Sequence, residues 1–195
     1  TPASLTVKAN DQTSTYGVTQ VIPQTALLAS GLKNGDYISN ATILYAGNQI
    51  VSGAVNAGTY SNAITISNAA GVGVTNYTIS YVSGNLTVNK ANLVVTALAD
   101  GKFVSQTDLA ASSTNCSGSS CAGGYAGAMY SGFVNGDSVG SGALGSSPLV
   151  ITRINASTNS SGFYPNVLMP SGLNPQNYNV QYVAGSYTIA PAEQL

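Results

Sequence analysis

The chain has 195 residues and a formal net charge of −1, and only 6% of its residues are charged. This balance leaves no basic surface for nucleic acid or for an anionic membrane, and no apolar run is long enough to span a bilayer. The sequence contains no histidine, which makes Ser-His-Asp and Cys-His catalysis impossible. We therefore expect a protein that is not an enzyme, with no catalytic residues, no cofactor, no metal site, no nucleic-acid partner and no membrane insertion.

A surface with so few charges must be built from Ser, Thr, Asn, Gln and Gly, and tyrosine (12 residues) far exceeds phenylalanine (3 residues). This usage is typical of extracellular β-repeats and not of cytosolic enzymes. The length allows one large domain or two small ones. An internal repeat favours two, at residues 1–91 and 92–195.

The first predicted strand of the first repeat, at 5–9, alternates apolar and polar residues as a half-buried strand does, and its counterpart in the second repeat is 93–97. A turn block follows in both copies. It reads Ser-Gly-Leu-Lys-Asn-Gly-Asp at 30–36 and Ser-Gly-Phe-Val-Asn-Gly-Asp at 131–137. Because Asn-Gly dipeptides favour tight turns, we expect a turn or one short helix here, with the Leu or Phe packed above it.

The middle of each repeat is less similar, but it predicts further strands near residues 41–45, 63–67, 147–152 and 167–169. A closing stretch then repeats class for class. It reads NYTISYVSGNLTVNKA at 76–91 and NYNVQYVAGSYTIAPA at 177–192. Apolar alternation on both sides of Ser-Gly-Asn or Ala-Gly-Ser predicts a β-hairpin. We expect this hairpin to complete one core and to lead directly into the next repeat.

The second repeat carries an insertion. The first strands of the two repeats are 88 residues apart, whereas the turn blocks and the closing stretches are 101 residues apart. About thirteen extra residues therefore lie between the first strand and the turn block of the second repeat. The insertion, at about 108–127, holds the only two cysteines, Cys116 and Cys121. In a secreted protein these would pair and close a small loop. A metal pair and a redox pair are the alternatives, and we prefer the structural disulfide because zinc needs more ligands and redox motifs have closer spacing.

Together these blocks resemble the MBG-type repeat of large bacterial surface adhesins, which is frequent in filamentous-haemagglutinin-like exoproteins secreted by the two-partner route. The resemblance implies an extracellular, non-enzymatic, adhesin-associated module. Residues 1–4 also resemble 190–193, so we expect neighbouring repeats of the same longer chain as partners. The residues that carry the resemblance are Leu5, Val7, 30–36, 58–60 and 76–91, with Leu93, Val95, 131–137, 162–164 and 177–192 in the second copy.

The fold is expected to be mainly β, with two tandem β-rich repeats. Each repeat would form a β-grasp-like sheet with at most one short helix, and an immunoglobulin-like β-sandwich is the alternative. We expect a structural stalk or spacer in a secreted bacterial adhesin. The alternative function is binding of a host glycan or surface protein through the Cys116–Cys121 insertion.

A few residues are candidates for contacts outside the chain. Tyr125 and Tyr130 adjoin the insertion, where they would either stack on a sugar or pack beneath the loop, and packing is the preferred interpretation. Asn115 and Asn159 begin Asn-x-Ser triplets that are placed for glycosylation.

Overall fold

The structure is a computed structural model that describes residues 1–107 and 125–192, and it is mainly β, as predicted. The chain divides into two compact units, unit 1 at Thr1–Lys90 and unit 2 at Ala91–Leu195. Cys116, Cys121 and Asn115 lie outside the described residues. The disulfide and the modification at Asn115 therefore stay predictions.

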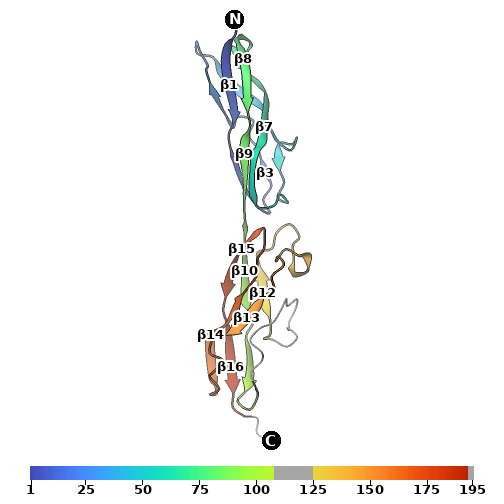
Figure 1. Ribbon diagram of the computed structural model, residues 1–195, viewed down its shortest axis with the longest axis vertical. Coiled ribbons are helices and arrows are strands. Elements are labelled where there is room, and N and C mark those ends of the chain that lie inside the picture. The colour runs from blue at the N-terminus through green and yellow to red at the C-terminus, as the bar shows by residue number, and fades with distance from the viewer. Residues whose placement is uncertain (108–124, 193–195) are drawn as a thin grey trace. The chain divides into compact units, whose positions relative to one another are not determined.

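Unit 1 is built from β-strands that form two main sheets and one small ribbon (Figure 1). A three-stranded sheet has the order β4-β1-β8, a four-stranded sheet has the order β2-β9-β7-β5, and β3 pairs with β6. The elements are β1 (Ala3–Ala9), β2 (Gln12–Thr15), β3 (Gln20–Val21), β4 (Leu27–Ser30), β5 (Tyr37–Tyr45), β6 (Ile50–Val51), β7 (Gly58–Val72), the 3-10 turn η1 (Val74–Asn76), β8 (Tyr77–Val82) and β9 (Gly84–Asn89).

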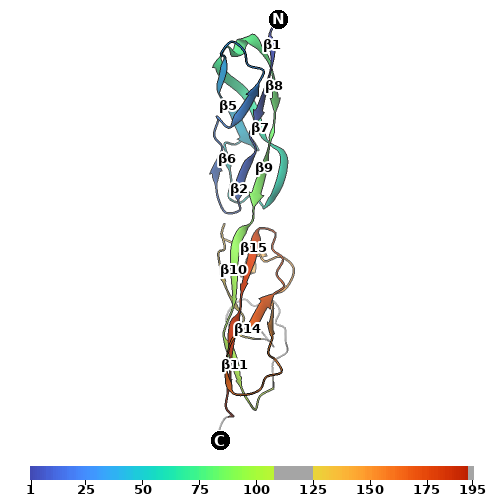
Figure 2. The same ribbon diagram turned by 90° about the vertical axis from the view of Figure 1, so that its left-hand side faces the viewer.

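Unit 2 repeats the two main sheets (Figures 1 and 2). Their strand orders are β12-β10-β15 and β11-β16-β14-β13, which correspond one for one to those of unit 1. The described residues of unit 2 contain no counterpart of the β3-β6 ribbon. The elements are β10 (Ala91–Ala97), β11 (Asp100–Phe103), β12 (Ala128–Ser131), the 3-10 turn η2 (Val139–Ser141), β13 (Val150–Arg153), β14 (Gly162–Ser171), β15 (Tyr178–Val183) and β16 (Gly185–Ala190).

The core of each unit lies between its two sheets. In β1 the inward side chains of Leu5 and Val7 are at most 1% exposed, and in β10 Leu93 takes the same place as Leu5. They face apolar side chains of the four-stranded sheet, because β1 contacts β7 and β10 contacts β14. Each fully buried aliphatic side chain contributes about 2 kcal/mol, and strict alternation therefore holds each strand in one register.

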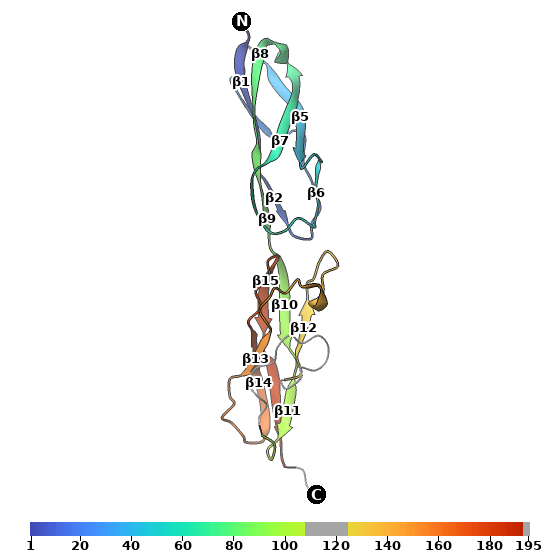
Figure 3. The same cartoon turned by 45° about the vertical axis from the view of Figure 1, so that its right-hand side comes forward.

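The closing stretch of each unit is not the β-hairpin that its sequence predicts. Strand β8 pairs in parallel with β1, from Ala3 opposite Tyr77 to Lys8 opposite Val82. Strand β9 pairs in parallel with β2 and antiparallel with β7, and Figure 3 shows β8 beside β1 and β9 beside β2. The two consecutive strands therefore belong to different sheets. Strands β15 and β16 repeat the arrangement in unit 2.

A glycine marks the place where this stretch crosses from one sheet to the other. Gly84 and Gly185 do not have the positive φ of a hairpin turn. A Cβ on Gly84 would lie 2.7 Å from the Ala9 carbonyl oxygen, and one on Gly185 would lie 2.5 Å from that of Ala97. Glycine is required here because two backbones approach closely. The glycine of the Ser-Gly-Asn and Ala-Gly-Ser segments, which predicted a hairpin turn, is thus explained by close backbone packing and not by a turn.

The layers of each unit are closer to the predicted sandwich alternative than to a β-grasp-like sheet. The described residues contain helical structure only as the single 3-10 turns η1 and η2. The parallel pairs β1-β8 and β10-β15 nevertheless differ from the antiparallel sheets of an immunoglobulin sandwich. Each unit is thus a two-sheet β module in which the first two strands lie beside the last two, β1 beside β8 and β2 beside β9 in unit 1.

Candidate functional site

The turn block of unit 1 is held by a tyrosine from the closing stretch. The Asp36 N–H donates to the Lys33 carbonyl oxygen (2.9 Å), and Asn34 and Gly35 have φ values of 56° and 77°, as in a type I′ turn. The Tyr77 hydroxyl accepts from the Lys33 N–H and donates to Asp36 Oδ2, both at 2.8 Å. Desolvation first and the bond to Asp36 second raise the pKa of Tyr77.

Unit 2 contains the same network. The Tyr178 hydroxyl donates to Asp137 Oδ2 at 2.6 Å and accepts from the Val134 N–H at 3.1 Å. The Asp137 N–H closes the turn on the Val134 carbonyl oxygen at 2.9 Å. The Asp36 and Asp137 carboxylates therefore each accept a hydrogen bond from a tyrosine hydroxyl. This joins the turn to the closing stretch.

Other tyrosines that recur in both units serve the local backbone in matching ways. Each of these tyrosine hydroxyls forms its hydrogen bond at the equivalent position of the two units. The Tyr60 and Tyr164 hydroxyls donate to the Asn56 and Ser160 carbonyl oxygens at 2.8 Å, and the Tyr81 and Tyr182 hydroxyls accept from the Ala69 and Leu173 N–H groups at 2.9 Å.

The two units differ in the loop that follows β2 or β11. In unit 1 this loop begins with the buried Tyr16 and with Gly17, whose φ is 88° and whose N–H donates to the Gly53 carbonyl oxygen at 2.8 Å. In unit 2 the register places Val104 and Ser105 there, and the Val104 N–H donates to the Ala190 carbonyl oxygen at 3.0 Å. The insertion follows this loop.

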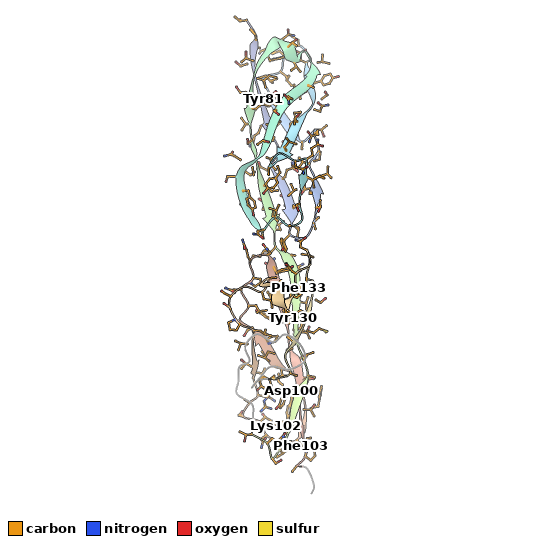
Figure 4. The ribbon with its side chains drawn as sticks, turned by 90° about the vertical axis from the view of Figure 1, so that its right-hand side faces the viewer. Tyr81, Asp100, Lys102, Phe103, Tyr130 and Phe133 are labelled. Carbon is orange, nitrogen blue, oxygen red and sulfur yellow. The ribbon has the colours of Figure 1, made fainter. Side chains whose placement is uncertain are left out.

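An open hollow of about 280 Å³ lies beside this loop in unit 2. Gly101 pairs with Thr188, and Phe103 pairs with Ala190. At these four positions unit 1 has Thr13, Thr87, Thr15 and Asn89, so the hollow exists where unit 2 has the smaller Gly101 and Ala190. Figure 4 shows Asp100, Lys102 and Phe103 close together in this part of unit 2. The hollow is lined by Gly101, Lys102, Phe103, Gln106, Thr188 and Ala190.

The polar groups of the hollow are held by the loop itself. The Lys102 ammonium donates to the Gln106 carbonyl oxygen at 3.2 Å, and Gln106 Oε1 accepts from the Phe103 N–H at 2.8 Å. The Phe103 ring is half-buried and forms an apolar wall. The hollow thus places one aromatic ring beside hydrogen-bonding side chains.

The described C-terminal end of the insertion, at Tyr125 and Ala126, is fixed to the core. Asp100 Oδ1 accepts from the Gly101 N–H at 2.7 Å and Asp100 Oδ2 from the Ala126 N–H at 2.9 Å. Tyr125 is 1% exposed, and its ring lies edge-on to Tyr187 with centroids 5.9 Å apart. Such a ring has no free face for a sugar. Tyr125 therefore packs inside unit 2, against Tyr187.

The second predicted tyrosine lies farther along the same unit. Tyr130 is half-buried and stacks on Phe133, with centroids 5.9 Å apart and an interplanar angle of 23° (Figure 4). Its hydroxyl is buried and has no hydrogen-bond partner among residues 1–107 and 125–192. Desolvation first and Tyr182 second raise the pKa of Tyr130. Neither predicted tyrosine lines the hollow.

Asn159 and Arg153 lie in the loop and strand near β14. Asn159 is exposed, and its amide nitrogen donates to the Val104 carbonyl oxygen at 3.1 Å. Arg153 is buried, with its guanidinium carbon 4.5 Å from the centroid of the Tyr187 ring, which indicates a cation–π contact. Sequence reasoning missed Arg153, and the available signal was a charged residue directly after a predicted apolar strand.

The fold and the recurring contacts define a class of protein, the tandem two-sheet β module. Residues 5–87, which make up most of unit 1, match the family model described as the MBG domain (YGX type), and Tyr16-Gly17 is a Tyr-Gly pair inside the matched range. MBG domains are modules of surface proteins and are not a known enzyme family. No curated protein and no solved structure matches the chain.

Two further observations concern the part of the chain that the structure describes. It holds no helix that is long and apolar enough to cross a membrane. Within the same residues, no three His, Cys, Asp or Glu side chains gather as they would at a metal ion.

Proposed function

We propose that the chain is a non-enzymatic structural module of a secreted bacterial surface adhesin, and that it acts as a spacer in a tandem array. The observation that supports this most is that the polar residues shared by the two units serve the fold. Tyr77 and Tyr178 each bind the turn of their own unit, through Asp36 and Asp137. A module repeated for its ligand would instead share exposed polar or aromatic side chains.

The connection between the units also supports a spacer. Strand β9 ends at Asn89 and β10 begins at Ala91, so only Lys90 separates the last strand of one unit from the first strand of the next. One residue is too short to behave as a flexible coil. The array would therefore be built without flexible linkers.

The spacer function is tested by replacing the module in the parent bacterium. Residues 1–192 are exchanged for two unrelated β domains of similar length, and a second strain has them deleted. We expect the exchange to keep adhesion and the deletion to reduce it. Loss of adhesion in the exchange strain, with normal surface display, would show that these units contact the receptor.

A second candidate function is binding of a host glycan or surface protein by unit 2, and the hollow beside β11 favours it. The Phe103 ring offers a face for an apolar sugar surface, and the Gln106 amide and Thr188 hydroxyl offer hydrogen bonds. A volume of about 280 Å³ lies just below the usual range of ligand pockets, about 300–1,000 Å³. The hollow therefore fits one small group, such as a single sugar ring.

The binding candidate is tested on a glycan array with the purified chain. Phe103→Thr removes the ring, and Ala190→Asn narrows the hollow, since each introduces the residue that unit 1 has there. A signal that both variants lose supports the hollow. A signal that both variants keep, but that is lost when residues 115–124 are replaced by a short turn, assigns binding to the insertion instead. A blank array counts against both.

A further inference from the structure

We infer that each unit is a mechanical clamp that resists a force applied along the chain. This inference rests on the proposed spacer function for its meaning in the bacterium. The observation behind it is that the first two strands of a unit pair in parallel with its last two strands. In unit 1 β1 and β8 pair in parallel over six register positions, and β2 and β9 over four.

The direction of the strands decides how a pull acts on these ladders. The chain enters unit 1 at the Ala3 end of β1 and leaves it at the Asn89 end of β9. Because β1 and β2 run parallel to β8 and β9 (Figure 3), a pull at the two chain ends slides the two stretches past each other. Every ladder hydrogen bond is then loaded at once, whereas peeling would break the bonds one by one.

Unit 2 has the same ladders. Strands β10 and β15 pair in parallel over six register positions, and β11 and β16 over four. A force transmitted along the chain must pass through both units in turn. The clamp is therefore present in each repeat and does not depend on how the units are placed.

The structure shows which N–H groups of β8 face β1. The Tyr77 N–H donates to Val74 in the preceding turn, and N–H directions alternate along a strand. The N–H groups of Thr78 and Ser80 therefore face β1. In unit 2 the Ala91 N–H of β10 donates to the carbonyl oxygen of Asn177, the residue before β15, at 2.9 Å. This bond agrees with the same parallel pairing in unit 2. Because Ser80 is exposed, proline there removes a clamp donor without disturbing the core.

A matched control exists on the other side of β1. Strand β4 pairs antiparallel with β1, and Leu28 lies opposite Lys8. The Leu27 N–H donates to the Thr25 carbonyl oxygen, so the Leu28 N–H faces β1. Leu28 is exposed as well. Leu28→Pro therefore removes one ladder donor from the same sheet, but from a strand that does not connect the two pulled ends.

The experiment is single-molecule force spectroscopy of the full chain held at its two termini. Two unfolding events are expected, one for each unit. Relative to Ser80→Ala, Ser80→Pro should speed forced unfolding of unit 1 about fivefold or more, because one ladder bond is lost from the loaded transition state. Leu28→Pro should change that rate by less than about twofold, even where its equilibrium destabilisation is similar. Unit 2 is the internal reference in both cases.

A second measurement uses the unchanged ladder, so it does not depend on a proline variant that folds. Asn76 is exposed and lies directly before β8, and a handle attached there, pulled against the N-terminus, peels β1 from β8. We expect unit 1 to open at a much lower force in this geometry than through its termini. Equal forces in the two geometries, or equal effects of Ser80→Pro and Leu28→Pro, would overturn the clamp.

These outcomes are separable from those of the adhesion test. A weak clamp together with adhesion that survives the domain exchange overturns the clamp alone. A strong clamp together with adhesion that is lost in the exchange overturns the spacer alone.

Discussion

Units 1 and 2 have the same two main sheets but differ in the loop that follows β2 in unit 1 and β11 in unit 2. Both cross between the sheets at a glycine, Gly84 or Gly185, and both fix their Asn-Gly turn with a tyrosine, Tyr77 or Tyr178. At the loop, unit 1 forms the β3-β6 ribbon, whereas unit 2 carries the insertion. The residues that stay the same are those that set backbone approach and turn geometry.

The difference shows where this fold tolerates change. About thirteen extra residues enter unit 2 without altering the strand order of either main sheet. Loops on a rigid scaffold accept such changes because few ladder bonds depend on them. Shared positions should therefore respond alike in both units when mutated, and positions that differ should not.

The largest effect is expected at the sheet crossings. Gly84→Ala and Gly185→Ala each place a Cβ within 2.7 Å of a backbone oxygen, and overpacking of this kind costs about 3 kcal/mol. Gly140→Ala is the control, since a Cβ there has no neighbour within 4 Å. Urea unfolding of the full chain checks all three. A large cost in only one unit would break the equivalence of the crossings.

A medium effect is expected at the tyrosines that hold the turns. Tyr178→Phe removes the donor to Asp137 from a hydroxyl on a residue only 1% exposed, which should cost about 2 kcal/mol of unfolding free energy. Tyr77→Phe removes the equivalent bond from a half-buried ring, so its cost should be smaller but of the same sign. Thermal unfolding of the two variants measures both stability costs. If Tyr178→Phe left the stability unchanged, the tyrosine–aspartate bond would not stabilise the turn.

The smallest effect is expected at Tyr130 in unit 2. Its hydroxyl is buried without a partner among the described residues, so Tyr130→Phe should be neutral or stabilising by up to about 1 kcal/mol at pH 7. Phe133→Leu, which changes the ring that stacks on Tyr130, is the comparison and should be destabilising. A clear loss of stability in Tyr130→Phe would mean that the hydroxyl does bind a partner.

The raised pKa of Tyr130 predicts that the free energy of unfolding depends on pH in the alkaline range. The pKa of Tyr130 is raised above its ordinary value of 10.0, so the unfolded chain loses this proton first. The contribution of Tyr130 to the free energy of unfolding should be fully present below about pH 10 and should be lost as the pH rises through the native pKa. Tyr130→Phe should reduce that loss, as urea unfolding at a series of alkaline pH values would show. An unchanged alkaline slope would contradict the shift.

The sequence predicted what depends on local pattern. The alternation of Leu5 and Val7 located β1, because a strand buried on one face has a period of two. The Asn34-Gly35 pair located the turn, because both residues adopt positive φ there. The MBG resemblance was found from these blocks, and the matched residues 5–87 confirm it for unit 1.

The sequence did not predict what depends on pairing between distant strands. Alternation identifies β8 and β9 as strands, but the same pattern suits a hairpin or two strands in different sheets. Strand β2 was missed because Gln12–Thr15 contains no apolar residue, and its buried side chains, Gln12 and Ser14, are polar. The hollow at Gly101 was missed because it arises from small residues on two separate strands, β11 and β16.

The central claim is that the first strand of each unit pairs in parallel with the first strand of its closing stretch, β1 with β8 and β10 with β15, and NMR of the full chain tests it most directly. We predict cross-strand nuclear Overhauser effects between Leu5 and Ile79 in unit 1 and between Leu93 and Val180 in unit 2, in keeping with the register. Contacts that instead join β8 to β9 and β15 to β16 would restore the hairpin and contradict both the fold and the clamp.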